Sequence, residues 1–257
     1  MAKTIGVINQ KGGVGKTTTT IELAYALTMK KKRVLVIDLD QQGNLSAYLN
    51  ADTELPTIFE VLQAECSVKD AVQNKGKINL IASSKELSKS DKVFGDTEDM
   101  FLLKDVIEII QDDYDYILID NGPSRSSLLT MTYACSNSIV IPTEADEGSL
   151  TGIREINSDL ERYRELAKKG RMNVTDAKID MLILNKFENT IVHSEIKQML
   201  EDISIEYEDH PIVATVRKSI VATESKPFRM SIQEYSPKSN TAEDYKNAAK
   251  LLMRRLK

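Results

Sequence analysis

A segment rich in glycine and lysine near the start of the chain has the residue types of a phosphate-binding loop. It reads Gln10-Lys11-Gly12-Gly13-Val14-Gly15-Lys16-Thr17-Thr18. Glycines let a backbone turn tightly and direct several N–H groups into one concavity, where an anion binds. In such a loop Lys16 contacts the β- and γ-phosphates of a nucleotide, and the Thr17 hydroxyl coordinates Mg²⁺. We therefore expect Lys11 to Thr18 to bind a nucleoside triphosphate.

The spacing in this loop differs from the general pattern G-x-x-x-x-G-K-[ST]. The first glycine of that pattern would fall on Gln10, and the chain instead has K-G-G-x-G-K-[ST] with a second lysine, Lys11. The apolar run Thr4–Asn9 precedes the loop, and helical spacing from Lys16 to Lys32 follows it. A strand before the loop and a helix after it are the context that phosphate binding requires, because the helix start offers free N–H groups and a positive dipole end.

Acidic residues end two further apolar runs. Asp38 and Asp40 close the first, and Asp120 closes the second. Ligands of open α/β sheets bind at the carboxyl ends of the strands, so we expect all three carboxylates to face the phosphate loop. An aspartate at the end of an apolar strand holds Mg²⁺ directly or through water in many nucleotide hydrolases. The alternative for Asp40 is a structural role as the cap of a turn in D-x-D-x-x-G-N.

The elements that position these residues alternate between strands and helices. The short apolar runs that predict buried strands are Thr4–Asn9, Arg33–Asp38, Ile78–Ala82, Tyr114–Asp120, Ser138–Pro142 and Ile179–Asn185. The segments with helical spacing are Lys16–Lys32, Met100–Asp112, Ser126–Ala134, Ser149–Lys169, Val192–Asp202 and Thr241–Arg255. This order predicts an α/β fold with a doubly wound, mostly parallel sheet and helices on both faces.

Length and composition are those of a globular protein. The chain has 257 residues, 41% hydrophobic and 28% charged, which excludes disorder as its main state. We expect one domain over residues 1–257, with residues 51–99 as a surface excursion on it. No apolar run is long enough for a signal peptide or a membrane span, and Cys66 and Cys135 are far apart, so we expect reduced, buried thiols in a cytoplasmic protein.

Charge is distributed unevenly along the chain. The net charge is −5, but residues 210–257 hold ten Lys or Arg against four Asp or Glu, a balance of +6 that leaves −11 for the rest. A basic C-terminal quarter is compatible with contact to an anionic surface, and it is equally compatible with ordinary solvated helix faces.

The loop and the acidic segments together resemble the ParA/MinD family of P-loop ATPases, whose deviant Walker A motif is K-G-G-x-G-K-[ST]. The resemblance implies ATP and Mg²⁺ as cofactors, ATP hydrolysis and a homodimer formed with ATP. It implies that Lys11 reaches across the dimer to the partner's phosphates and that Asp40 positions the attacking water, so that Lys11, Lys16 and Asp40 are the catalytic residues. Gln41 stands where the family usually has proline, and Pro123 is the one remaining proline of the usual turn after the Asp120 strand.

The same resemblance implies further ligand contacts. Thr17, Asp38 and Asp120 form the Mg²⁺ site, with Asp38 as an indirect partner of the ion. Asn185 falls where the family contacts the purine. Pro211 falls where backbone groups line the adenine.

Two functions remain open at this stage. The loop begins at residue 11, which is similar to the small Soj-type members, so one function is a nucleoid-associated ATPase for plasmid or chromosome partition. It would bind duplex DNA without sequence preference and be stimulated by a ParB-like partner, with phosphate contacts from Arg217, Lys218, Lys226, Arg229, Arg254 and Arg255. The alternative is a MinD-like positioning ATPase with a C-terminal amphipathic helix on the membrane. The tail AAKLLMRRLK lacks a bulky aromatic residue, which disfavours the membrane.

A metabolic ATP-dependent enzyme is a third interpretation, since the wider superfamily shares the loop. The sequence shows no cluster of substrate-binding residues beyond the nucleotide site. An iron–sulfur relative is disfavoured, because no cysteine pair stands in a loop at a strand end.

Overall fold

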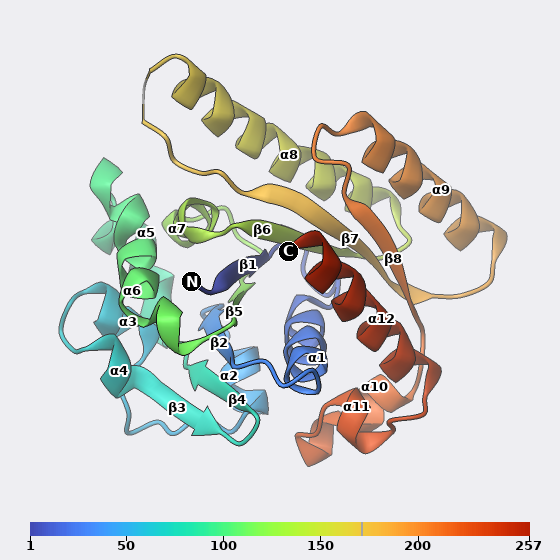
Figure 1. Ribbon diagram of the computed structural model, residues 1–257, viewed down its shortest axis with the longest axis horizontal. Helices are drawn as coiled ribbons and strands as arrows, with labels where there is room; N and C mark the ends of the chain where they lie inside the picture. Colours follow the sequence, from blue (N-terminus) through green and yellow to red (C-terminus); the bar gives the residue numbers. More distant parts are fainter. Residues whose placement is uncertain (171) are drawn as a thin grey trace.

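The computed structural model describes residues 1–170 and 172–257, and the strands of this part form one sheet (Figure 1). The spatial order is β3-β4-β2-β5-β1-β6-β7-β8. The strands are β1 (Lys3–Val7), β2 (Val34–Leu39), β3 (Val72–Lys75), β4 (Ile78–Ile81), β5 (Tyr116–Asn121), β6 (Ser138–Thr143), β7 (Lys178–Phe187) and β8 (Ile212–Arg217). Strand β3 is antiparallel to β4 at one edge, and every other pairing is parallel. The predicted α/β class and mostly parallel sheet are confirmed.

Helices connect the strands. The longer ones are α1 (Lys16–Thr28), α6 (Leu102–Ile110), α7 (Ser127–Cys135), α8 (Glu147–Lys168), α9 (Ile191–Glu206) and α12 (Asn240–Arg255). The short ones are α2 (Asn44–Tyr48), α3 (Ile58–Leu62), α4 (Val68–Ala71), α5 (Ser90–Val93), α10 (Val221–Glu224) and α11 (Ile232–Tyr235). Single 3₁₀ turns are η1 (Lys85–Lys89), η2 (Thr97–Phe101), η3 (Gln111–Asp113) and η4 (Lys226–Phe228).

Side chains alternate between the two faces of the sheet, and each face has its own helices. In β2, Val34 and Val36 pack with α1 and α12, whereas Leu35 and Ile37 pack with α3, α4, α6 and α7. The β6–β7 part of that second face is covered by α8 and α9. Strands that are buried on both faces read as continuous apolar runs, which is why the sequence revealed them.

Three expectations about the fold need correction. Residues 51–99 are not a surface excursion, because Ile58, Phe59 and Leu80 are buried in the core. Strands β3 and β8 were missed, since each lies at an edge of the sheet and carries partly exposed residues that break the apolar pattern. Cys135 is buried as expected, but Cys66 is only partly buried; both thiols are free.

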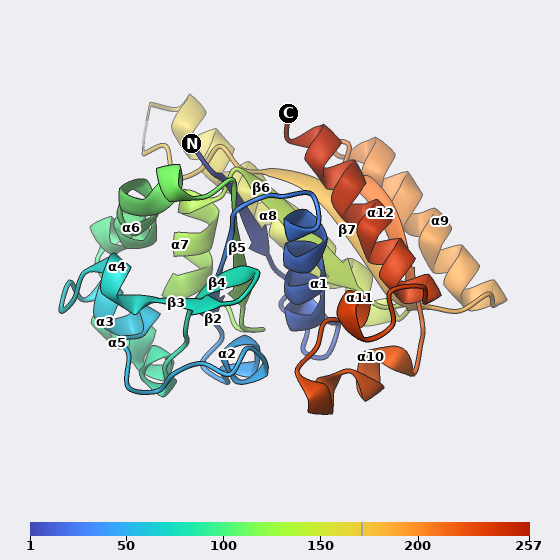
Figure 2. The same cartoon turned by 60° about the horizontal axis from the view of Figure 1, so that its bottom comes forward.

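Helix α12 packs along α1 and the sheet (Figure 2). It buries Tyr245, Ala248, Ala249 and Leu252, and the partly buried Leu251, Met253 and Leu256 pack against the same core. The apolar face of the last helix therefore covers the sheet. No helix in the described residues is long and apolar enough to cross a membrane.

Candidate nucleotide-binding site

The phosphate loop connects β1 to α1 at the carboxyl edge of the sheet. Gly13 and Gly15 have φ values of 82° and 88°, a left-handed backbone that favours glycine. A Cβ atom at Gly12 or Gly13 would meet no atom within 4 Å, so this stretch of backbone borders open space. The Nζ of Lys16 donates a hydrogen bond to the Lys11 carbonyl oxygen at 2.9 Å, which holds its charge inside the loop. The loop is a cradle of the shape an anion requires.

Asn185, two residues before the end of β7, supports the loop from beneath. Its Nδ2 donates to the Val14 carbonyl oxygen at 2.8 Å and to the Thr19 hydroxyl at 3.3 Å, and its Oδ1 accepts the Tyr245 hydroxyl at 3.2 Å. A Cβ at Gly15 would lie 2.8 Å from this Nδ2, so only glycine allows the approach. Asn185 thus joins the loop to β7 and α12, a role that sequence reasoning missed because its partners are far away along the chain.

The two carboxylates at the end of β2, both of which we expected to face the phosphate loop, have different partners. Strand β2 ends at Leu39, so the alternation of side chains that would align Asp38 with Asp40 does not continue. Asp38 is fully buried and accepts hydrogen bonds from the Ser46 N–H at 2.8 Å, the Ser46 hydroxyl at 2.7 Å and the Asp40 N–H at 3.1 Å. Asp40 lines the cavity beside the phosphate loop, and its Oδ1 accepts the Gln42 N–H at 3.0 Å.

Asp120 lies at the end of β5, in register with Asp38 on β2 and Val7 on β1. It is fully buried, and the Thr20 hydroxyl donates to its Oδ1 at 3.4 Å. Burial, and then the Asp38 charge, raise the pKa of Asp120 well above its usual value. Burial lowers the pKa of the Lys16 ammonium, while the charges of Asp120 and Asp40 oppose that shift. The loop lysine and these carboxylates therefore form one electrostatic unit.

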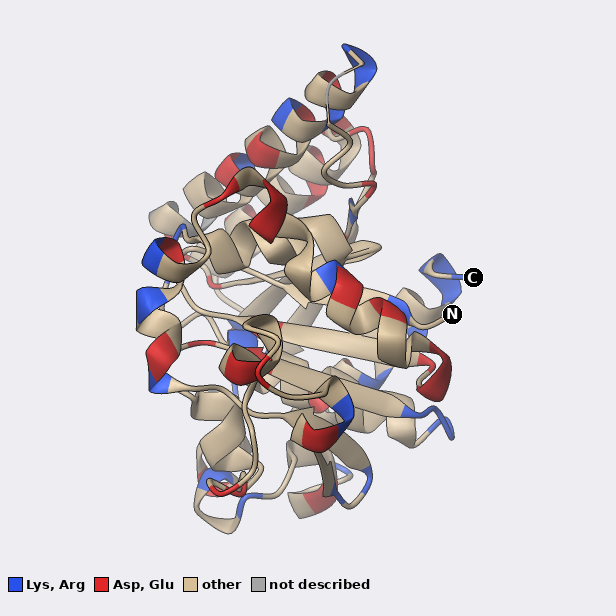
Figure 3. Ribbon diagram, turned by 90° about the vertical axis from the view of Figure 1, so that its left-hand side faces the viewer, with Lys and Arg blue, Asp and Glu red and all other residues tan. Residues whose placement is uncertain are grey.

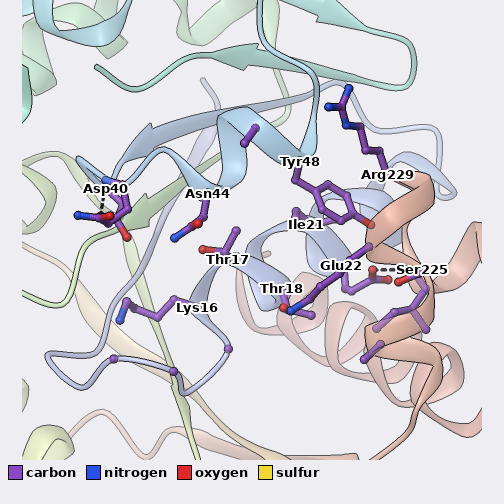
Figure 4. Close-up of a pocket in the computed structure, with 18 of the residues that line it drawn as sticks. Lys16, Thr17, Thr18, Ile21, Glu22, Asp40, Asn44, Tyr48, Ser225 and Arg229 are labelled. Atoms are coloured by element: carbon purple, nitrogen blue, oxygen red, sulfur yellow. Dashed lines mark hydrogen bonds between the residues drawn. The ribbon is translucent and has the colours of Figure 1, made fainter. Parts of the chain in front are cut away.

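Two adjoining cavities open at this edge of the sheet. The first, here called the loop cavity, has a volume of about 670 Å³ and is lined by the phosphate loop, Asp40, Asn44 and Tyr48 (Figure 4). The second, here called the side cavity, has a volume of about 400 Å³ and is lined by Asn185, Tyr245 and residues after β8. Together they offer space for a nucleotide with its phosphates at the loop and its base toward β7 and β8.

Lys11 stands at the rim of the loop and not inside it. Its Nζ forms an ion pair with Asp146, which lies just before α8, and both side chains are more than a third exposed. Lys16 is the lysine whose ammonium lies within the loop.

The cations predicted for DNA are spread over the molecule, and most have partners. Those that line the two cavities are Arg217, Lys218, Lys226 and Arg229. Arg217 forms a bidentate pair with Asp244 at 2.9 and 2.7 Å, and Lys218 pairs with Glu188 at 3.2 Å. Arg255 forms an ion pair with Asp180 at 2.9 Å, and Arg229 donates a hydrogen bond to the Asn50 side chain. Lys226 and Arg229 line the loop cavity. The structure does not gather these residues into one free basic face.

Pro211 does not lie near the candidate nucleotide site. It precedes β8, which runs parallel to β7 and begins at Ile212, so it stands at the amino edge of the sheet, opposite the phosphate loop. Its carbonyl oxygen accepts the Ser204 hydroxyl at 2.6 Å. The expectation that Pro211 lines the adenine is wrong, because the residues that reach the cavities follow β8 and do not precede it.

Comparison with known proteins shows the family of the chain. The family described as "AAA domain" matches residues 2–174, well over half of the chain. An uncharacterized protein of Pseudomonas putida is 31% identical over 99% of this chain and 96% of its own length. The sporulation initiation inhibitor protein Soj of Bacillus subtilis is 29% identical over 97% of this chain and 98% of its own. The chain belongs to the ParA/MinD family of P-loop ATPases and is an ATP-hydrolysing enzyme.

Solved structures share the fold. An ATP complex of a variant of McdA from Cyanothece has a TM-score of 0.83 at 21% identity, covering 98% of this chain and 96% of that one. A plasmid partition protein of Borrelia burgdorferi bound to AMPPNP has a TM-score of 0.79 at 22% identity, covering 99% and 100%. Cobyrinic acid a,c-diamide synthase of Mycobacterium smegmatis with ADP and magnesium has a TM-score of 0.79 at 24% identity, covering 100% and 96%. The fold thus serves both partition proteins and a biosynthetic enzyme.

Proposed function

We propose that this ATPase is a ParA-type partition protein that dimerises on ATP, binds duplex DNA without sequence preference and releases it when a ParB-like partner stimulates hydrolysis. The similarity to Soj over nearly the whole of both chains supports the class. The observation that carries the dimer is the position of Lys11. A lysine at the rim of the loop, outside the cradle that Lys16 occupies, is placed to meet a second molecule.

The residues present fit ATP with Mg²⁺. The cradle of Gly12 and Gly13 borders open space, as a polyphosphate requires. Asp120 carries a fully buried Oδ2 that has no hydrogen-bond partner among the described residues, as expected of a carboxylate that binds a metal or its water. Thr17 and Asp120 would hold the ion, with Asp38 behind them. When bound, Mg²⁺ neutralises charge on the β- and γ-phosphates.

The chain's own residues divide the work of hydrolysis. Lys16 binds the β- and γ-phosphates as a point charge, and Asp40, which faces the loop cavity, orients the attacking water. Lys11 of the opposite molecule would stabilise the charge that develops on the transferred phosphoryl group. Asp38 holds α2 through Ser46 and thereby fixes the segment that carries Asp40.

DNA contacts are best supplied by cations that the fold leaves unpaired. On α12, Lys250 and Arg254 are exposed, lie one helical turn apart and form no ion pair within the described part of the chain. Acidic and basic residues are interspersed on the flank built by α3 to α6, which favours no polyanion there (Figure 3). The membrane alternative is weaker, because the apolar side chains of α12 already pack against the core.

The test is binding of duplex DNA in the apo, ADP and ATP states at several salt concentrations. We expect strong DNA binding only in the ATP state. The slope of log K against log salt should be about −0.9 for each phosphate neutralised. Lys250→Glu with Arg254→Glu should weaken binding to every sequence and leave ATP affinity unchanged. Lys69→Glu with Lys104→Glu, a matched reversal on the other flank, should change neither. Equal binding in all three states, or none, would refute the partition function, and pelleting with anionic vesicles would then favour the membrane alternative.

A further inference from the structure

Lys226 occupies a position between the two cavities. It lines both the loop cavity and the side cavity, together with only five other residues: Gly15, Thr18, Lys186, Ala222 and Ile232. Gly15 and Thr18 belong to the phosphate loop and the first turn of α1, so Lys226 stands across the junction from them. Lys226 forms no ion pair and no side-chain hydrogen bond within the described residues. A cation without an acidic partner, beside a phosphate cradle, is suited to an anionic ligand.

The junction corresponds to one part of a nucleotide. If Lys16 and Thr17 hold the β- and γ-phosphates in the loop cavity and the base lies in the side cavity, the α-phosphate lies between them. Backbone N–H groups of a phosphate loop contact the α- and β-phosphates at this point. The opposite side of the α-phosphate then faces the segment that carries Lys226.

That segment, residues 221–235, is here called the strap. It follows β8, contains α10, η4 and α11, and is anchored on α1 through Glu22. The Oε1 of Glu22 accepts the Ile232 N–H at 2.7 Å, and its Oε2 accepts the Gln233 Nε2 at 3.1 Å. The same Nε2 also donates to the Glu22 carbonyl oxygen at 2.6 Å. Glu22 is 1% exposed, so these bonds are shielded from water.

Contacts from the other side of the loop cavity hold the strap a second time. The Tyr48 hydroxyl on α2 donates to the Met230 carbonyl oxygen, and Arg229 donates to the Asn50 side chain. Figure 4 shows Tyr48 reaching from α2, and Glu22 from α1, toward the strap, which carries Ser225 and Arg229. Lys77 pairs with Glu234 at 2.9 Å. The strap is thus fixed on both sides of the point where Lys226 faces the junction.

We propose that Lys226 is a further nucleotide-contacting residue, which binds the α-phosphate, and that Glu22 is a positioning residue that holds the strap in place for it. The inference rests on nucleotide binding at Lys16, as proposed above, and is independent of DNA binding and partition. It reassigns Lys226, which the sequence suggested as a DNA contact, to the ATP site.

The test compares Lys226→Gln with Lys104→Gln, an exposed lysine on α6 far from both cavities, by titration of each variant with ATP and with ADP in the presence of Mg²⁺. A charge-assisted hydrogen bond of this kind should make the Kd values of both nucleotides rise by about fivefold to tenfold in Lys226→Gln. Lys104→Gln should bind as the unmodified protein does. Both lysines are exposed, so folding is unaffected.

The outcomes separate this inference from the proposed site. Unchanged Kd values in Lys226→Gln, or a change for ATP alone, would overturn the α-phosphate contact. A loss of DNA affinity at saturating ATP, with normal Kd values, would overturn it in favour of the DNA contact. Lys16→Ala in the same titration tests the proposed nucleotide site itself. If Lys16→Ala binds ATP normally, the phosphate loop is not the nucleotide site. If Lys16→Ala loses ATP binding while Lys226→Gln binds normally, only the α-phosphate contact is refuted.

The role of Glu22 is tested by rescue. Glu22→Ala removes the acceptors for Ile232 and Gln233 and should raise both Kd values by about as much as Lys226→Gln. Glu22→Gln keeps an acceptor for the Ile232 N–H, and the Gln233 Nε2 still donates to the carbonyl oxygen of residue 22. Glu22→Gln should therefore restore nucleotide affinity. Adding Glu22→Ala to Lys226→Gln should give no further loss; additive effects would overturn the positioning role.

Discussion

The Nζ of Lys11 is ion-paired with the carboxylate of Asp146 in the same chain. The two side chains are 38% and 39% exposed, and a pair this accessible contributes up to about 1 kcal/mol. The lysine expected to cross to a second molecule is therefore held by a contact that is easily exchanged. In the dimer proposed above, this pair must break before Lys11 reaches the partner's phosphates.

Asp146→Asn should favour the ATP-dependent dimer. Each of the two chains loses one such pair when the dimer forms, and together the pairs contribute up to about 2 kcal/mol to the separate chains. Without them the dimer should form at up to about thirtyfold lower protein concentration. Analytical ultracentrifugation with ATP measures this shift. Lys11→Ala is the matched control, and it should bind ATP but lose both dimer formation and turnover. A weaker dimer in Asp146→Asn would contradict this expectation and show that Asp146 stabilises the dimer and not the separate chain.

Lys16→Ala should abolish measurable ATP binding. The ammonium that reaches into the loop is lost, and backbone donors alone then face the β- and γ-phosphates. Calorimetric titration with ATP measures the effect, with Lys104→Ala as the control on a distant exposed lysine. Unchanged ATP affinity would exclude this loop as the nucleotide site.

Asp40→Asn should bind ATP and dimerise but not hydrolyse. The amide keeps an oxygen for the Gln42 N–H, so the local turn persists, while the negative charge that orients water is lost. We expect turnover to fall by about 100-fold or more. Phosphate release and ATP titration on the same preparation separate the two properties. Normal hydrolysis would return Asp40 to the role of a turn cap.

Glu22→Gln should alter the pH dependence of stability. Burial raises the pKa of Glu22 to about 7 from 4.5. The folded protein therefore keeps a proton that the unfolded chain releases, and the free energy of unfolding falls as pH rises from 4.5 to about 7. The glutamine variant lacks this slope, so its stability relative to the unmodified protein should increase by about 3 kcal/mol across that window and stay level above it.

Urea unfolding at pH 5, 6, 7 and 8 provides the measurement. The nearby Glu234 raises the pKa of Glu22 in the same direction, so Glu234→Gln should reduce the slope only slightly. A difference between the glutamine variant and the unmodified protein that does not change with pH would show that Glu22 is ionised throughout.

The sequence alone was sufficient for the class of fold and the phosphate loop. Both depend on local patterns, namely β-branched runs buried on both faces of a sheet and a glycine-rich turn whose conformation only certain residues allow. The position of Asp120 followed from the same logic, because parallel strands bring their carboxyl ends to one edge. The sequence did not predict the edge strands β3 and β8, because partly exposed residues at the edge of a sheet interrupt the apolar run.

Tertiary structure decided which side chains meet. Asp38 meets Ser46 because α2 packs against β2, and Asn185 supports the loop because β7 carries it to the Val14 carbonyl oxygen. Lys226 reaches the nucleotide cavities because Glu22, more than 200 residues earlier in the chain, anchors the strap. The count of charges along the sequence suggested that the C-terminal cations form one basic surface. In the structure, Arg217 is instead ion-paired with Asp244. Pairings of this kind depend on where chain segments cross in space, and no local pattern encodes that.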